Sequence, residues 1–240
     1  MTLERLDFES GVVGRSLGRL RLPEADRASL PGLLAQARAA GFAHLVAHVD
    51  ASDARGAQTL AEHGFRQVDD AIVVRRGSAE MVPGARPRGL RAARPQDLQP
   101  LLQRCGTVFR HSRFYRDDFF SEAQAEAIYR QWIVNCFGGR ASLLRVASDD
   151  RGVCGFVAAR LEAAHAVAWI ELLAVASDAA GQGLGRRLLS AALCELHGRV
   201  DAVRVKTQAD NAAALALYGR VGFEPVARQR GFALRLDSWK

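Results

Sequence analysis

A glycine-rich turn between a strand-like stretch and a helical pattern constrains this chain more than any other feature. Residues 169–176 read WIELLAVA, and the turn that follows reads Gly181-Gln182-Gly183-Leu184-Gly185. Glycines let backbone N–H groups approach an anion, and the start of a helix adds positive potential. The pattern therefore predicts an anion-binding turn, to which Arg186 adds charge. The helix after the turn is indicated by apolar residues at helical spacing, namely Leu184, Leu188, Leu189, Ala192, Leu193 and Leu196.

Two common phosphate-binding motifs do not describe this turn. The chain has no GxxxxGK[ST] sequence there, and a GxGxxG motif fails because position 188 is a leucine. On this fragment alone, a tight connection between a strand and a helix that binds no ligand is the alternative.

A second patterned segment begins at Asn211 and ends with a Gly-Phe turn. Asn211 stands at the start of an alanine-rich helical pattern, where its side chain can cap the helix or bind a ligand. Tyr218 follows seven residues later, close to two helical turns, so both residues share one face. Taken alone, Tyr218 fits core packing better than catalysis.

Together, the two segments resemble the GNAT superfamily of N-acetyltransferases. The family's pyrophosphate-binding motif, R/Q-x-x-G-x-G/A, is similar to residues 180–185, although Ala180 replaces the usual Arg or Gln. The family's N-x-x-A-x-x-x-Y pattern is present as Asn211, Ala214 and Tyr218, followed by Gly222-Phe223. The resemblance covers about residues 89–236. It implies acetyl-CoA as co-substrate and an α/β (α+β) GNAT fold. The order of strand and helix patterns likewise predicts a twisted mixed sheet with helices on both faces.

The resemblance also implies roles for individual residues. Tyr218 is the candidate general acid, because a tyrosine with a pKa of about 10 stays protonated at neutral pH and can protonate a thiolate whose pKa is about 8.5. Glu171 is the candidate general base, with an Arg-paired structural carboxylate as the alternative, and His111 is a rival base. Cofactor-binding residues are expected at Leu173, Ala174, Val175, Gly181, Gln182, Gly183, Leu184, Gly185, Arg186 and Asn211.

The implied reaction is direct attack of an amine on the acetyl thioester in a ternary complex. The reactants are expected in a cleft where two adjacent strands splay apart. The free edge of residues 173–175 would pair with the pantetheine arm as another strand would, and a backbone N–H there would stabilise the developing oxyanion.

A narrower resemblance concerns the acceptor. The sequence His111-Ser112-Arg113-Phe114-Tyr115, with residues 128–133 further on, is similar to the TDP-fucosamine acetyltransferases, which acetylate a nucleotide-linked 4-amino-4,6-dideoxygalactose for enterobacterial common antigen. It implies substrate-binding roles for His111, Arg113, Tyr115, Tyr129 and Trp132, although Tyr129 and Trp132 fit helix-core packing equally well. Two alternatives stay open. One is a GNAT enzyme that acetylates a protein N-terminus, a ribosomal protein or another small amine, and the other is a non-catalytic acyl-CoA-sensing or RNA-binding module.

The chain is predicted to contain two GNAT-like parts. Residues 75–94 are rich in Arg, Pro and Gly, which indicates a linker. We expect a truncated GNAT-like N-terminal domain over 1–76, a linker over 77–88 and a catalytic domain over 89–240. An internal repeat supports this division, because Gly64-Phe65 aligns with Gly222-Phe223 at an offset of 158 residues and strand 44–49 then falls on strand 202–207. Chance similarity of two Ala-rich βαβ units is the alternative.

The remaining elements are expected as follows: strands at 89–92, 141–147, 153–161, 166–176, 202–207 and 232–236, and helices at 95–109, 122–137 and 211–221.

Charge and cysteine usage limit the other possibilities. The 240 residues carry a net charge of +7, and 31 of the 33 basic residues are arginines, but these are spread along the chain, so no nucleic-acid partner is expected. Four separate cysteines predict free thiols and no metal site. No apolar run is long enough to span a membrane, and no signal peptide is recognised, so a cytoplasmic protein is expected. A homodimer is plausible by base rate.

Overall fold

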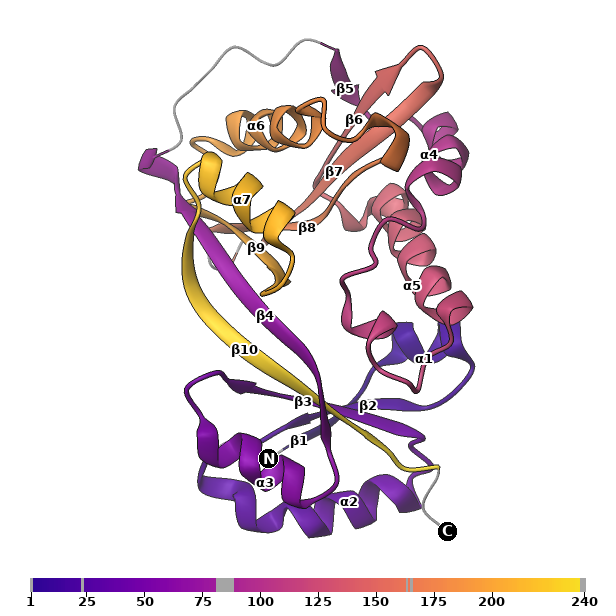
Figure 1. The fold of residues 1–240 in the computed structure, drawn as a ribbon, viewed down its shortest axis with the longest axis vertical. Helices are drawn as coiled ribbons and strands as arrows, with labels where there is room; N and C mark the ends of the chain where they lie inside the picture. Colours follow the sequence, from indigo (N-terminus) through magenta and orange to yellow (C-terminus); the bar gives the residue numbers. More distant parts are fainter. Residues whose placement is uncertain (1, 23, 81–88, 163, 165, 238–240) are drawn as a thin grey trace. The chain divides into compact units, whose positions relative to one another are not determined.

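The computed structural model describes residues 2–22, 24–80, 89–162, 164 and 166–237, which form two compact units (Figure 1). The first unit combines the chain up to Ile72 with His111–Ile128 and the residues from Ala227 onward. The second combines Val73–Arg110 with Tyr129–Val226. Each unit therefore joins segments that are distant in the sequence.

The first unit is a sheet with its strands in the order β1-β2-β3-β10-β4. Strands β2 and β3 are parallel, whereas β1 pairs with β2 and β10 pairs with β3 in antiparallel fashion. Its core includes the fully buried side chains of Leu30, Leu45 and Leu60. Its elements are β1 (Thr2–Arg5), α1 (Asp7–Val13), β2 (Leu17–Arg21), α2 (Leu30–Ala39), β3 (His44–Asp50) and α3 (Ala54–Glu62), with part of β4 (Arg66–Gly77) and of β10 (Glu224–Arg235).

The second unit is a mixed sheet with its strands in the order β4-β9-β8-β7-β6-β5. Strands β8 and β9 are parallel, and β5, β6, β7 and β8 pair successively in antiparallel fashion. Its strands are β5 (Leu90–Ala92), β6 (Leu143–Asp149), β7 (Gly152–Glu162), β8 (Val167–Val175) and β9 (Ala202–Gln208). Its helices are α4 (Leu98–Cys105), the second half of α5 (Glu122–Asn135), α6 (Leu184–Leu196) and α7 (Ala212–Arg220).

Helices cover both faces of this mixed sheet. Residues 153–159 of the central strand β7 are all buried, although successive side chains of a strand point to opposite faces. Helix α6 packs on β6, β7 and β8, and a side chain added at Gly155 would come within 3.2 Å of Leu188 on α6. Helix α4 also packs on β7. The predicted twisted mixed sheet with helices on both faces is confirmed.

Most expected elements are present, with differences at the ends of several of them, including β6, which was expected at 141–147 and lies at Leu143–Asp149. The first expected helix begins as a 3₁₀ turn at Pro95–Asp97 and ends at Cys105, before Gly106, where any side chain would strike the Leu102 carbonyl at 2.5 Å. Helix α5 ends at Asn135 and continues as a π-helical turn, Cys136–Arg140, in which Gly139 adopts φ 98°. Strand β10 begins eight residues earlier than the expected 232, because its first half is exposed and polar and carries no hydrophobic signal.

The repeat is visible in the element boundaries. Strands β3 and β9, helices α3 and α7, and strands β4 and β10 are each offset by 158 residues at both ends. Equivalent caps open the two helices, with Asp53 accepting from the Gly56 N–H and Asn211 from the Ala214 N–H. The predicted domains 1–76 and 89–240 are defined as two related copies in the sequence, whereas the two units are defined by compactness. The predicted domain boundaries therefore stay a prediction. Residues 81–88 of the predicted linker lie outside the described residues, while Gly77 ends β4 and Ser78–Glu80 form a 3₁₀ turn.

In the described part of the chain, no helix combines the length and the apolar character that crossing a membrane requires.

Candidate active site

Strands β8 and β9 separate partway along their length. Their parallel pairing begins at Val167–Ala202 and, among the described residues, ends at Ile170–Val205, although β8 continues to Val175. On its other edge β8 stays paired with β7, but Ala158 opposes Leu172 and Ala159 opposes Ile170, so Glu171 is an extra residue in β8. The bulge and the separation leave the β9-facing edge of residues 171–175 open to a ligand.

A cavity of about 490 Å³ lies at the end of β8. Its walls come from β8, from the glycine-rich turn with the start of α6, and from one side of α7. It brings together nine predicted site residues: Leu173, Ala174, Val175, Gly181, Gly183, Leu184, Gly185, Arg186 and Tyr218. The other lining residues are Ala179, Ala180, Ala213, Ala214, Leu217 and Arg220. We call this the cofactor cavity.

The turn has the backbone conformation that an anion site needs. Gly181 and Gly183 adopt φ of 79° and 74°, a left-handed region in which other residues are strained. Gly183 is the N-cap of α6 and, as a glycine, has no side chain that could cap the helix. The first N–H groups of a helix have no partner within the helix, so here they are available to an anion entering the cavity. These features, with Arg186 and Arg220 on the walls, fit the pyrophosphate of a coenzyme A molecule.

Two predicted cofactor residues do not line this cavity. Gln182 lies in the exposed part of the turn. Asn211 caps α7, since its side chain accepts the Ala214 N–H at 3.1 Å. The observed role of Asn211 is therefore to position the helix that carries Tyr218, and contacts of either residue with a cofactor stay predictions.

Tyr218 combines burial with a place in the cavity wall. Its side chain is only 6% exposed, and its ring lies 5.7 Å from that of Phe223. Burial raises the pKa of Tyr218 to about 12, because the phenolate would lose its hydration. The phenol therefore carries its proton throughout the neutral range, as a proton donor requires.

Glu171 lies in a second, smaller cavity of about 240 Å³. We call it the glutamate cavity, and its lining residues are Trp132, Cys136, Arg140, Arg160, Trp169, Ile170, Glu171, Leu172 and Lys206. Glu171 accepts bonds from Arg140 at 3.0 and 2.9 Å and from Arg160 Nε at 2.8 Å. Because residues 169–172 line this cavity and residues 173–175 line the other, the two cavities follow one another along β8.

The predicted substrate residues fall into different surroundings. Trp132 lines the glutamate cavity. Tyr129 is buried and stacks on Phe109 with ring centroids 4.5 Å apart, so its observed role is core packing.

His111, Arg113 and Tyr115 belong to the first unit. His111 is exposed there. Arg113 lies 3.7 Å from Glu9 and 4.1 Å over the Phe114 ring. The substrate roles of all three residues stay predictions.

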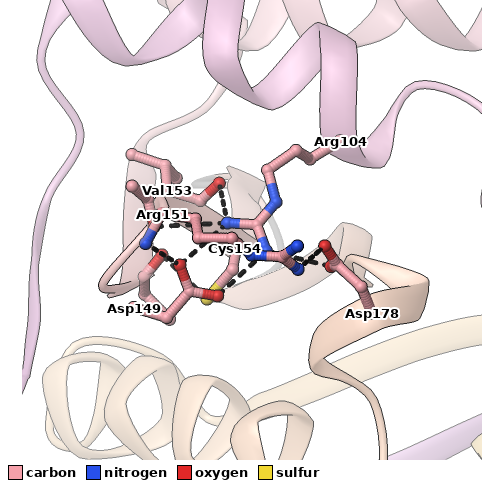
Figure 2. A network of polar contacts seen from close by, with 8 residues as sticks. Arg104, Asp149, Arg151, Val153, Cys154 and Asp178 are labelled. Carbon is pink, nitrogen blue, oxygen red and sulfur yellow. Dashed lines mark hydrogen bonds and ion pairs between the residues drawn. The ribbon is translucent and has the colours of Figure 1, made fainter.

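An arginine outside both cavities holds the base of the glycine-rich turn (Figure 2). Arg104 of α4 binds Asp149 at 3.0 and 2.9 Å and Asp178 at 2.9 Å. Asp178 belongs to the 3₁₀ turn Ser177–Ala179, which leads from β8 into the glycines. Arg151 pairs with the same Asp178. These bonds raise the pKa of Arg104 and hold the pKa of Asp149 at about 2.

The sequence did not single out several of these residues. No spacing distinguishes four of them from the many other basic residues along the chain, namely Arg104, Arg140, Arg160 and Lys206. Arg220 had a usable signal, because it follows Tyr218 by two residues in the last turn of a helix already identified. Within the described part of the chain, no three His, Cys, Asp or Glu side chains are grouped so as to hold a metal ion.

Comparison with known proteins identifies relatives of this chain. Residues 103–223, half of the chain, match the acetyltransferase (GNAT) family. The spore coat polysaccharide biosynthesis protein SpsD of Bacillus subtilis (strain 168) is 27% identical over 133 residues, which cover 54% of this chain and 44% of SpsD. A mycothiol acetyltransferase of Clavibacter michiganensis subsp. michiganensis (strain NCPPB 382) is 41% identical over 88 residues, which cover 36% and 28% of the two chains. This chain thus spans less than half the length of either relative.

The fold has solved counterparts. The crystal structure of a GCN5-related N-acetyltransferase from Sphaerobacter thermophilus superposes with a TM-score of 0.66 at 17% sequence identity. The match covers 97% of this chain and 76% of that one. At this identity the likeness concerns the fold alone.

Proposed function

The chain belongs to the acetyltransferase (GNAT) family and has its fold, and on that basis we propose that it transfers an acetyl group from acetyl-CoA to the amine of a small molecule. The observation that carries the proposal is the cofactor cavity. It joins an open strand edge, an uncapped helix N-terminus behind two left-handed glycines, and a buried tyrosine.

Each part of the cofactor cavity has a task in this reaction. The glycine-rich turn and Arg186 would hold the pyrophosphate, with Arg220 beside them. The open edge of residues 173–175 would pair with the pantetheine arm in the manner of an added strand. When bound, acetyl-CoA supplies the acetyl thioester. Tyr218 would then donate its proton to the departing thiolate, because burial keeps the phenol neutral.

Glu171 is the proposed proton acceptor on the other side of the reaction. Its carboxylate accepts two bonds from Arg140 and one from Arg160, two of them on Oε1 and one on Oε2. A carboxylate offers about four lone-pair sites, so Oε2 retains one for an amine or a bridging water. Its place in the bulge of β8, two residues before Leu173 of the cofactor cavity, supports contact with the attacking nitrogen.

For the acceptor we propose a nucleotide-linked amino sugar of the dTDP-4-amino-4,6-dideoxygalactose type. Support comes from the resemblance around Arg113 and from SpsD, whose name refers to polysaccharide biosynthesis. Trp132 and Trp169 give the glutamate cavity two aromatic side chains, which suit the apolar face of a sugar or a base. The similarity to mycothiol acetyltransferases supports a different small amine as the second candidate.

The N-terminal part is proposed to be a truncated copy of the catalytic domain. The offset of 158 residues holds for both ends of three consecutive elements, and Asp70 pairs with Arg228 at equivalent positions of the two copies. Leu60 is buried where Tyr218 stands in the other copy. We therefore propose that residues 1–76 carry no catalytic tyrosine and that chemistry is confined to residues 89–240.

The proposal is tested by thiol release from acetyl-CoA with the purified chain. The amines are dTDP- and UDP-linked amino sugars, a small thiol-bearing amine and a peptide with a free N-terminus. We expect turnover with a nucleotide-linked amino sugar and little with the peptide. Turnover with the peptide alone would show that the acceptor is a peptide amine and not an amino sugar. Absence of both turnover and acetyl-CoA binding would contradict the proposed function.

A further inference from the structure

The glutamate cavity carries more positive than negative charge. Three of its lining side chains are cationic (Arg140, Arg160 and Lys206), and one, Glu171, is a carboxylate. Cys136 adds no negative charge, because burial and the nearby Glu171 raise the pKa of its thiol to about 11. An amine approaching as a simple cation would therefore meet a site of its own sign.

Arg140 and Arg160 are held in place by Glu171, yet both keep exposed surface, and together they keep uncompensated positive charge. Arg140 forks onto both oxygens of Glu171, and Arg160 reaches the same carboxylate through Nε. Their side chains nonetheless remain 45% and 37% exposed. One carboxylate offsets only one of the two guanidinium charges. A guanidinium is a rigid planar fork, so once its position is set, its remaining N–H groups point in defined directions.

We propose that Arg140 and Arg160 bind an anionic group of the acceptor, so that the substrate is an amine that also carries a phosphate or a carboxylate. This inference rests on the proposed function, and it concerns the acceptor rather than the cofactor. Pairing of an oxyanion with both guanidinium groups reduces the excess positive charge of the cavity. It also places the amine next to Glu171, at the point of β8 where the cofactor cavity begins.

The walls of the cavity set the shape of such an acceptor. Trp132, Trp169, Ile170 and Leu172 surround the charged groups with apolar surface. Fixed polar groups in an apolar cavity are the usual arrangement for binding a small molecule in one orientation. The arginines would thus favour amines that carry an anionic group over amines that lack one. The tryptophans would contact the ring that joins the anionic group to the amine.

The direct test is binding of inorganic pyrophosphate and of malonate to the full chain saturated with coenzyme A, which fills the cofactor cavity. Isothermal titration compares the natural protein with Arg140→Gln/Arg160→Gln. Arg199→Gln, an exposed arginine that lines neither cavity, is the matched control. Arginine–oxyanion bonds are charge-assisted, so we expect the double variant to bind the preferred anion at least about tenfold more weakly. Arg199→Gln should bind it normally. Tighter binding of pyrophosphate indicates a phosphate-bearing acceptor, and tighter binding of malonate a carboxylate-bearing one.

Equal binding by the natural protein and the double variant, or no binding of either anion, would overturn the inference. A second readout uses thiol release with three amines of one ring type: glucosamine, glucosamine 6-phosphate and muramic acid. Preference for a charged member that disappears in the double variant supports the inference, and equal rates for all three contradict it. Failure of the proposed function is read separately, as loss of acetyl-CoA binding and turnover in the natural protein.

Discussion

Arg104 Nη2 lies 2.9 Å from Asp178 Oδ1, and this bond ties helix α4 to the turn that precedes the glycines. The same guanidinium binds Asp149 and the Val153 carbonyl, so it connects α4, the β6–β7 hairpin and the end of β8 (Figure 2). None of these atoms lines the cofactor cavity. We therefore expect this ion-pair cluster to fix the position of the turn, so that a change in the cluster acts on cofactor binding without altering a residue of the cavity wall.

Replacing Arg104 by alanine should weaken acetyl-CoA binding while leaving chemistry intact. We expect Kd to rise about threefold to tenfold, which corresponds to roughly 0.7–1.4 kcal/mol. Titration calorimetry gives Kd, and kcat at saturating acetyl-CoA should stay within about twofold. Arg199→Ala serves as the control for loss of an arginine. An unchanged Kd in Arg104→Ala would show that the turn holds its conformation without this cluster.

Replacing Gly183 by alanine should affect both stability and cofactor binding. A side chain at φ 74° costs roughly 1–2 kcal/mol, and we expect that loss in urea unfolding. Gly219 is the matched control, because it lies in α7 with open space around an added side chain, so alanine there should stabilise by about 0.5 kcal/mol. If Gly183→Ala proves as stable as the natural protein and binds acetyl-CoA equally well, the left-handed turn has no role.

The pH dependence of stability should reveal the Arg104–Asp149 bond. Because Arg104 holds the pKa of Asp149 at about 2, below its usual value of 3.8, the ionised carboxylate stabilises the folded state. Its contribution is complete above about pH 5, decreases as the pH falls below 3.8, and is lost as the pH falls through about 2. The stability difference between Asp149→Asn and the natural protein in urea unfolding should therefore be full at pH 6 and much smaller at pH 2. A difference as large at pH 2 as at pH 6 would contradict this assignment.

Replacing Glu171 by glutamine separates a proton acceptor from a carboxylate that merely orients arginines. We expect kcat to fall by about a hundredfold, the scale of general base catalysis, with acetyl-CoA affinity preserved. Glu195→Gln is the control, since Glu195 pairs with Arg145 and lines neither cavity. If only the KM of the acceptor rises and kcat persists, Glu171 acts through Arg140 and Arg160 alone.

Periodic patterns and capping chemistry made most of the second unit predictable, whereas β1, α1, β2 and α2 of the first unit were not predicted. The spacing of leucines after the glycine-rich turn predicted α6. A capping box opens α5, in which Ser121 and Gln124 each accept the other's backbone N–H at 3.0 and 3.2 Å, and this S-x-x-Q spacing is readable in the sequence. These signals are local, so the sequence contains them directly. The first half of β10 carried no such signal, because a polar exposed strand resembles a loop.

The candidate site was predictable where it follows a contiguous motif and unpredictable where it depends on tertiary contacts. Nine predicted residues meet in the cofactor cavity, and all of them lie on the two sequence motifs at 169–186 and 211–223. Glu171 pairs with Arg140 and Arg160, which lie 31 and 11 residues away in the sequence. Glu171 also lies in a bulge, which the hydrophobic pattern of β8 does not predict. Arg104 and Asp178 are 74 residues apart and come together only when α4 packs on the sheet.

The most direct test of the proposed function is acetyl transfer by Tyr218→Phe, measured together with the Kd of acetyl-CoA. The variant loses one hydroxyl and keeps the ring that packs near Phe223, so the fold and the cofactor cavity should persist. We predict a Kd within about twofold of the natural value and a kcat lower by about a hundredfold or more, the range of general acid catalysis. Full turnover by Tyr218→Phe at an unchanged Kd would contradict the assignment of this cavity as an acetyltransferase site in which Tyr218 protonates the departing thiolate.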